Sequence, residues 1–156
     1  MNNHTRVTSL IQKLRSHGHR LTPQRLAILR ILTESEAHPS VEEVYARVRV
    51  DFPMTSLATV YKTVAMLKEE GEILEIGLGG SSSRYDAAKP HPHPHLICTQ
   101  CQKILDPHLP LLVDVSQELA QKYGFQITNQ RMDFFGICPD CQQKSNLQIE
   151  IKGERK

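Results

Sequence analysis

Two Cys-x-x-Cys pairs, Cys98/Cys101 and Cys138/Cys141, contain all four cysteines of the chain. A structural zinc needs four soft ligands at the corners of a tetrahedron, and each pair supplies two of them from one turn. The 36 residues between the pairs exceed the spacing of an ordinary zinc ribbon, so we expect a folded unit between them. Two redox pairs or free thiols are the alternative. The pattern predicts one structural zinc per chain, stabilising a small C-terminal unit.

Length and charge narrow the class of protein. The 156 residues suffice for one ordinary domain or two small ones. The N-terminus lacks the apolar core of a signal peptide, and no segment approaches the ~20 apolar residues of a membrane span. We therefore expect a cytoplasmic protein, in which structural disulfides are disfavoured. Residues 1–32 hold six Lys or Arg and no acid, which suggests a phosphate-rich partner, although a solvated surface would look the same.

The first 86 residues predict a winged helix-turn-helix. Residues 6–17 have apolar positions at helical spacing, and three further helices each begin after a hydroxyl N-cap: Thr22, Ser40 and Ser56. Glu43 completes a capping box with Ser40, and the fourth helix should stop at Gly71. Two short strands, within 72–78 and 82–86, surround Gly79-Gly80. Helices followed by such a hairpin make a DNA-binding unit over residues 1–86.

The fourth helix is the candidate DNA reader. Its apolar residues recur at core spacing: Leu57, Val60, Val64 and Leu67. A hydroxyl-rich, neutral-to-basic set is then expected to face outward: Thr59, Lys62 and Thr63. A solvated face would look similar, but this composition suits the major groove better.

Residues 87–94, AAKPHPHP, form a semi-stiff hinge linker, because each proline pushes its predecessor to extended geometry. Residues 95–156 then form a second unit that is small enough to need zinc or a dimer for stability. Strands are expected at 95–98 and 103–106, a helix at 110–124 and a long strand at 125–138, whereas the tail is too weakly patterned to assign. The predicted fold class is α+β: a winged helix followed by a small α/β domain.

Six segments in order, TPQRLAIL, AHPSVEEVY, SLATVYKTV, SSRYD, HPHLICTQCQKILD and GICPDC, resemble the ferric uptake regulator family. The resemblance spans roughly residues 8–141 and is specific, because the DNA-reading helix and both metal motifs occur together. It implies a dimeric, metal-dependent transcription regulator with an N-terminal winged helix and a C-terminal dimerisation domain. Its partner would be double-stranded operator DNA, in an inverted repeat.

The resemblance also implies which residues hold metal. The structural zinc falls on the four cysteines, and the regulatory metal falls on five residues from both sides of the linker: His38, Asp86, His93, His95 and Asp106. In an extended strand the last two histidines would point to one side. Three imidazoles and two carboxylates suit Fe²⁺ or Mn²⁺, with Zn²⁺ as a competitor, and leave one octahedral position open. One extra residue in AAKPHPHPH adds His91, which could replace one of the two ligand histidines. The spacing to Cys98 fixes His95, and we take His91 as the histidine that does not bind. The other histidines are expected to be ordinary surface residues: His4, His17, His19 and His108.

Two features favour the peroxide-sensing branch. Iron-sensing members of the family typically have Glu where this chain has Asp106, and peroxide-sensing members have Asp. A further site of many iron sensors corresponds here to poor ligands: Pro94, Val113 and Gln130. By resemblance, Fe²⁺ reacting with peroxide would oxidise a ligand histidine, release the metal and free the promoter.

The resemblance also implies which residues contact DNA. Arg20 lies where the family has a basic residue near the minor groove, and Tyr61 and Lys62 lie where it has base contacts. Lys62 keeps the charge of the Arg found in many members but loses its bidentate fork. Arg25 is a candidate phosphate contact.

Three other functions compete with this hypothesis. An iron or zinc uptake regulator would use metal occupancy alone as its signal. An enzyme is disfavoured, because the zinc ligands already number four and no His-x-Glu, His-Glu-x-x-His, phosphate loop or nucleophile elbow is present. A metal chaperone could use HPHPH as a loose binding tract but would not need a winged helix.

Overall fold

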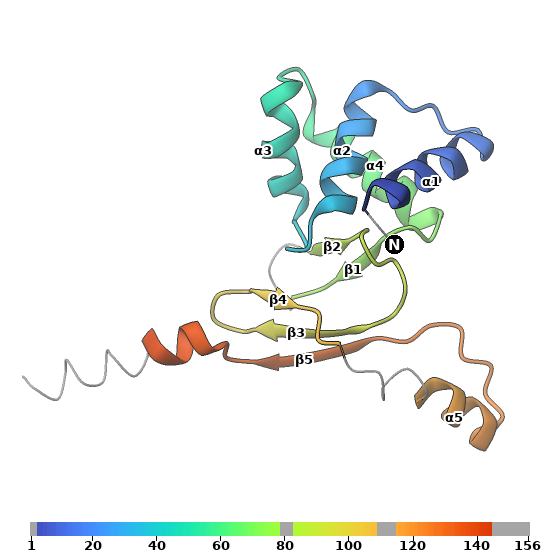
Figure 1. Ribbon diagram of the computed structural model, residues 1–156, viewed down its shortest axis with the longest axis vertical. Coiled ribbons are helices and arrows are strands. Elements are labelled where there is room, and N and C mark those ends of the chain that lie inside the picture. The colour runs from blue at the N-terminus through green and yellow to red at the C-terminus, as the bar shows by residue number, and fades with distance from the viewer. Residues whose placement is uncertain (1–2, 79–82, 109–114, 145–156) are drawn as a thin grey trace, which may run out of the picture. The chain divides into compact units, whose positions relative to one another are not determined.

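The computed structural model describes residues 3–78, 83–108 and 115–144. The chain forms two compact units, Met1–His91 and Pro92–Lys156. In Figure 1 the helices of the N-terminal unit run from blue to green, and the strands of the C-terminal unit run from yellow to red. No helix in the described ranges is long and apolar enough to cross a membrane.

Four helices form the bulk of the N-terminal unit: α1 (Asn3–Ser16), α2 (Pro23–Glu34), α3 (Val41–Asp51) and α4 (Leu57–Glu69). All three predicted N-caps are confirmed, since Thr22, Ser40 and Ser56 each accept a hydrogen bond from a backbone N–H three residues later. The capping box is complete, because the Ser40 N–H donates to Glu43 Oε2 at 2.8 Å. Gly71 follows α4 with a φ of +67°, which ends the helix as predicted.

A two-stranded antiparallel hairpin follows, with β1 (Leu74–Ile76) and β2 (Arg84–Asp86) in the register Leu74↔Asp86. A further bridge joins Ser40 to Arg84, and the Tyr85 N–H donates to the Pro39 carbonyl at 3.1 Å. These bonds fix the segment before α3 against β2. The predicted winged-helix architecture is confirmed, while Gly79-Gly80 lies outside the described residues.

The core of this unit lies among the four helices. Each of the four helices contributes at least one fully buried side chain to it: Leu10, Leu14, Ile28, Leu29, Leu32, Val44, Val48, Val60 and Leu67. Two expectations for α4 were wrong. Thr63 is buried, because its hydroxyl donates to the Thr59 carbonyl at 2.7 Å and so needs no water. Leu57 is 37% exposed, because it begins the helix beyond the reach of this core.

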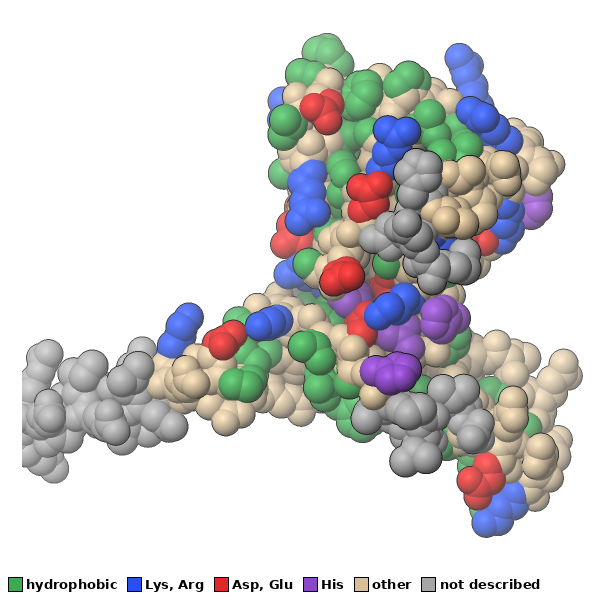
Figure 2. Space-filling model, in the orientation of Figure 1, with side chains coloured by type: hydrophobic (Ala, Val, Ile, Leu, Met, Phe, Trp, Pro, Cys, Tyr) green, Lys and Arg blue, Asp and Glu red, His purple; other side chains and the backbone are tan. Residues whose placement is uncertain are grey.

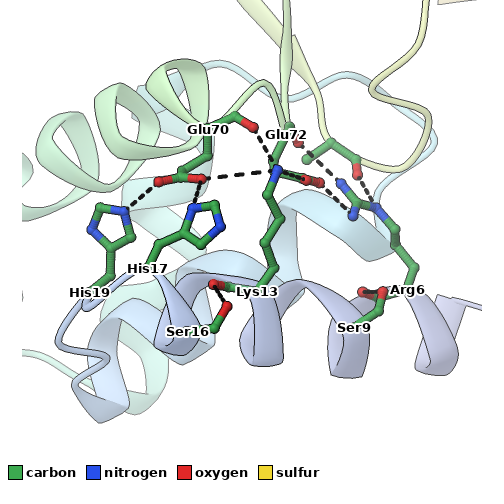
Figure 3. Close-up of polar contacts among 9 residues, drawn as sticks. Arg6, Ser9, Lys13, Ser16, His17, His19, Glu70 and Glu72 are labelled. Atoms are coloured by element: carbon green, nitrogen blue, oxygen red, sulfur yellow. Dashed lines mark hydrogen bonds and ion pairs between the residues drawn. The ribbon is translucent and has the colours of Figure 1, made fainter.

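Glu72 ties α1 to the turn after α4. Arg6 Nη1 and Lys13 Nζ lie 2.7 and 2.6 Å from its two carboxylate oxygens, and Figure 3 shows both side chains reaching from α1. Burial alone would raise the pKa of Glu72, but the hydrogen bonds from Lys13 and Arg6 outweigh it, so the pKa is lowered. Two of the six N-terminal cations therefore serve the fold rather than a partner.

Glu70 makes a similar connection with two histidines (Figure 3). His17 Nδ1 and His19 Nε2 each lie 2.7 Å from one of its carboxylate oxygens. The hydrogen bond with His19, and then that with His17, holds the pKa of Glu70 below its usual range. His17 is exposed and His19 is half-exposed, as expected for surface histidines, but both also join the end of α1 to the end of α4 through Glu70.

The C-terminal unit contains a three-stranded sheet in the order β4-β3-β5. Strand β3 (Pro94–Cys98) pairs antiparallel with β4 (Ile104–Leu105) and parallel with β5 (Met132–Gly136). Helix α5 (Val115–Tyr123) precedes β5, and residues 139–144 are helical. The first residues of the helix predicted at 110–124, and the tail after 144, lie outside the described residues.

The long strand predicted at 125–138 was wrong in extent. Only Met132–Gly136 is strand, because β3 is itself only Pro94–Cys98 and every residue of β5 already pairs with it. Residues 125–131 are exposed or half-exposed and do not form a strand. A short partner strand thus sets the length of the pair, whatever the β propensity of the flanking residues.

Apolar side chains remain exposed on the C-terminal unit, and Figure 2 shows some of them over its strands. Helix α5 buries none of its residues. The exposed set comes from α5, β5, the segment between them and the residue after β5: Val115, Leu119, Tyr123, Phe125, Ile127, Phe134, Phe135 and Ile137. An amphipathic helix and a strand that both leave apolar faces uncovered are typical of an association surface.

Candidate metal centres and DNA-reading face

The strand register brings the two cysteine pairs together. Cys98 ends β3 opposite Gly136, the last residue of β5, and the second pair begins two residues later. The four sulfurs lie within 4.8 Å of one another, and all four thiols are free of disulfide bonds. The Cys138 N–H donates to Cys98 Sγ at 3.3 Å, as is common for thiolates in structural metal sites.

These sulfurs fit a zinc ion. Sulfurs about 2.3 Å from a tetrahedral metal lie about 3.8 Å apart, and Cys101 Sγ and Cys138 Sγ are separated by 3.7 Å. Backbone N–H groups, first that of Cys101, lower the pKa of the Cys98 thiol to about 6. The neighbouring sulfur of Cys138, followed by burial, raises the pKa of Cys141 to about 12. The Cys141 thiolate is therefore disfavoured beside the neighbouring sulfurs unless a cation balances their charge.

A second cluster lies at the other end of β3. His93 and His95 flank Pro94, so their side chains emerge on one face, with ring centroids 4.4 Å apart. The pairing of Leu96 with Leu105 brings Asp106 across from His95. Its carboxylate oxygens lie 3.3 Å from His93 Nε2 and 3.9 Å from His95 Nε2. All three side chains are largely buried, whereas His91 is exposed and lies outside this group.

One residue that contacts this cluster was missed by sequence reasoning. Asp133 lies opposite His95 in the register of β3 and β5, and its Oδ1 is 3.3 Å from His95 Nδ1. The Arg131 guanidinium binds its other oxygen. A carboxylate alone in the strand MDFFG was the available signal, but it gains meaning only once the register with His95 is known.

The N-terminal unit pairs His38 with Asp86, two buried residues whose nearest ring and carboxylate atoms are 3.7 Å apart. The bridge between Ser40 and Arg84 brings them together. His38 has a φ of +50°, a conformation that a β-carbon disfavours, so the neighbouring structure holds the ring in place. Asp86 Oδ1 also accepts hydrogen bonds from the N–H groups of Ala88 and Lys89, which orients its carboxylate.

The donor atoms of both groups suit a hard or borderline divalent cation. Ligand atoms about 2.1 Å from a metal lie about 3 Å apart at right angles, so separations of 3.3–3.9 Å can close around an ion. Imidazole nitrogen and carboxylate oxygen are the ligands that iron, manganese and zinc accept in proteins. Within each unit, the residues named by sequence resemblance are therefore neighbours of the kind that a metal requires.

The residues proposed to contact DNA are accessible to different degrees. Tyr61 is 49% exposed on α4, and Lys62 beside it is exposed. The Tyr61 hydroxyl donates to Glu42 Oε1 at 3.2 Å, and the Glu42 charge raises the pKa of Tyr61. Arg20 is exposed, and Arg25 is half-buried with its guanidinium donating to the Arg20 carbonyl at 2.8 Å.

Comparisons with known proteins agree with this architecture. A peroxide-responsive repressor (PerR) of Staphylococcus saprophyticus is 44% identical over 86% of this chain and 90% of its own length. The structure of a Campylobacter jejuni peroxide stress regulator covers 85% of this chain and 98% of its own, with 32% identity and a TM-score of 0.69. That of the Helicobacter pylori ferric uptake regulator covers 91% and 95%, with 29% identity and a TM-score of 0.75. The family model described as "Ferric uptake regulator family" matches residues 16–135, and the chain belongs to that family.

Proposed function

We propose that this chain is a metal-dependent, DNA-binding transcriptional repressor that responds to peroxide. The observation that carries the proposal is the carboxylate of Asp106 beside His93 and His95, in a chain 44% identical to a peroxide-responsive repressor. At this position the chain has aspartate, as peroxide-sensing members of the family do, rather than the glutamate that is typical of iron-sensing members. The protein is proposed to act in the cytoplasm, where its DNA partner lies.

Two metals per chain are proposed. Zn²⁺ binds Cys98, Cys101, Cys138 and Cys141, and supports the small C-terminal core. Fe²⁺ or Mn²⁺ takes ligands from both units: His38, Asp86, His93, His95 and Asp106. Two carboxylates neutralise a divalent charge, and this oxygen and nitrogen set is harder than the four thiolates. The two sites therefore select different metals.

The chain's residues give the regulatory site its proposed role. A bound Fe²⁺ supplies one-electron reduction of peroxide, which Mn²⁺ does not. His38 and Asp86 belong to the DNA-binding unit, and His93, His95 and Asp106 follow the linker, so a shared metal would restrict how the two units are oriented. Loss of one ligand histidine by oxidation would remove that restriction and weaken DNA binding.

DNA binding is proposed to occur as a homodimer on an inverted repeat. Tyr61 and Lys62 on α4 contact bases, Arg20 enters the minor groove and Arg25 contacts phosphate. The exposed apolar residues of α5 and β5 supply the dimer surface, because a dimer would remove them from water. A two-fold dimer of winged helices reads two half-sites related by the same symmetry.

An iron-responsive uptake regulator is the second candidate. The TM-score to the Helicobacter pylori ferric uptake regulator, 0.75, exceeds the 0.69 to the Campylobacter jejuni peroxide stress regulator. In that function metal occupancy alone would be the signal, and peroxide would have no rapid effect.

A DNA-binding titration separates the two candidates. The probe is a duplex selected from a randomised pool by the Mn²⁺-loaded protein, and the protein is titrated anaerobically with Fe²⁺, Mn²⁺ or Zn²⁺ and then given a short peroxide pulse. We expect every metal that fills the site to promote binding, and peroxide to abolish binding of the Fe²⁺ form alone. Retained binding of the Fe²⁺ form would favour the uptake regulator.

A further inference from the structure

Asp133 occupies a place that the proposed ligand set does not explain. Its side chain is only 8% exposed, although it lies on β5, whose neighbouring apolar residues Phe134 and Phe135 are exposed. A buried carboxylate is costly unless it is paired and hydrogen-bonded. Both of its oxygens are engaged, Oδ1 at 3.3 Å from His95 Nδ1 and Oδ2 with the Arg131 guanidinium.

The contact fixes which nitrogen of His95 can bind a metal. An ionised carboxylate only accepts hydrogen bonds, so Asp133 Oδ1 requires the proton on His95 Nδ1. In the neutral ring, Nε2 then carries the lone pair. Nε2 is the atom that faces the Asp106 carboxylate, at 3.9 Å. Nδ1 of the buried His95 ring therefore donates its proton to Asp133, and the lone pair of Nε2 faces the cluster.

We infer that Asp133 is a positioning residue for the regulatory metal, acting through His95 rather than as a ligand. This inference rests on the proposed function for the presence of the metal, but the tautomer of His95 is a property of the chain itself. Metal-bound histidines commonly donate their second N–H to a carboxylate, which orients the ring and raises its basicity as a ligand. Asp133 contacts His95 through Nδ1, whereas the Asp106 carboxylate faces Nε2, so Asp133 supports the site through the His95 ring.

Arg131 completes the arrangement. Its guanidinium is 53% exposed and binds the Asp133 oxygen that does not face His95. The charge of Asp133 is thereby balanced from the solvent side, while its inner oxygen remains directed at the imidazole. Loss of Arg131 should have a smaller effect than loss of Asp133, because an exposed cation contributes little by comparison with a buried acceptor.

The test combines metal affinity with a direct readout of the ring. Full-length, zinc-replete protein is titrated with Mn²⁺, and the free ion is followed by electron paramagnetic resonance. The same zinc-replete protein without Mn²⁺ is examined by ¹⁵N NMR of its histidines. Asp133→Ala should lower Mn²⁺ affinity about 10- to 100-fold and shift His95 away from the Nδ1–H tautomer. Asp133→Asn, whose amide oxygen can still accept the Nδ1 proton, should keep the tautomer and lose less affinity.

Glu118→Gln on α5 is the matched control, because it removes one exposed carboxylate from the same unit and should change neither readout. Retained zinc and an unchanged unfolding temperature exclude loss of the fold. An Asp133→Ala protein with wild-type tautomer and wild-type Mn²⁺ affinity would overturn the inference. Zinc-replete wild-type protein that binds no Mn²⁺ would instead contradict the proposed function. The NMR would then still show whether Asp133 sets the tautomer of His95.

Discussion

At the scale of single residues, the chain uses the same chemical groups for different purposes. Histidine and glutamate fasten α1 to the end of α4 through Glu70, whereas histidine and aspartate gather in the two ligand groups. The sequence alone separates these roles poorly. The contacts of His17 and His19 with Glu70 and that of Asp133 with His95 could not be predicted, because the partners are 38 to 53 positions away in the sequence.

Cys138→Ser should abolish the tightly held zinc and cost several kcal/mol of stability, because the binding energy of a structural zinc is folding energy. The small core of the C-terminal unit cannot make up the difference. Elemental analysis and thermal unfolding measure the two effects. Wild-type protein purified without zinc yet cooperatively folded would contradict the assignment.

Glu72 should make stability fall on acidification. Its folded pKa is lowered, so its contribution is fully present above the unfolded value of about 4.3 and is lost as pH falls through the folded value. Glu72→Gln should cost about 1 kcal/mol at pH 7 and flatten the decline below about pH 4.5. Urea unfolding of the full chain from pH 3 to 7 checks this, with the exposed Glu69→Gln as control. Parallel pH profiles for wild type and Glu72→Gln would rule the contribution out.

At the scale of elements, local signals specified the structure wherever the relevant contacts are local. The caps at Thr22, Ser40 and Ser56 and the stop at Gly71 depend on residues within four positions, and all were predictable. The extent of β5 depends on β3, more than 30 residues earlier, and was not. The cysteine cluster is a long-range contact that could still be predicted, because two Cys-x-x-Cys pairs in one chain indicate a shared metal site.

Helix α4 carries the proposed reading function. Lys62→Ala should weaken binding to the selected duplex by about 1–3 kcal/mol and leave binding to random duplex less affected, because base contacts specify whereas phosphate contacts do not. Lys68→Ala is the control on the same helix, since Lys68 is bound to Glu75. Fluorescence anisotropy at several salt concentrations measures both duplexes. Equal losses on the two would mean that Lys62 contacts phosphate rather than a base.

At the scale of the whole molecule, the proposed regulatory metal and DNA must influence each other equally. If occupancy of the site raises affinity for the selected duplex by some factor, saturating duplex must raise Mn²⁺ affinity by the same factor. Mn²⁺ titrations with and without duplex, for wild type and His38→Ala, measure this coupling. The variant should lose it, because it removes the ligand contributed by the loop before α3. Mn²⁺ affinity insensitive to saturating duplex would exclude regulation by this site.

The peroxide response depends on chemistry at the ligands, and peptide mass spectrometry after a short peroxide pulse observes it directly. Fe²⁺-loaded protein should gain one oxygen atom on His38 or His93, while Mn²⁺-loaded protein gains none. The four clustered thiolates should be spared at low dose, because zinc coordination makes them less available to oxidants. An added oxygen on either histidine in the Fe²⁺ form alone is the predicted result; oxidation confined to the cysteines with loss of zinc, or no oxidation at all, would contradict peroxide sensing by the histidine–aspartate site.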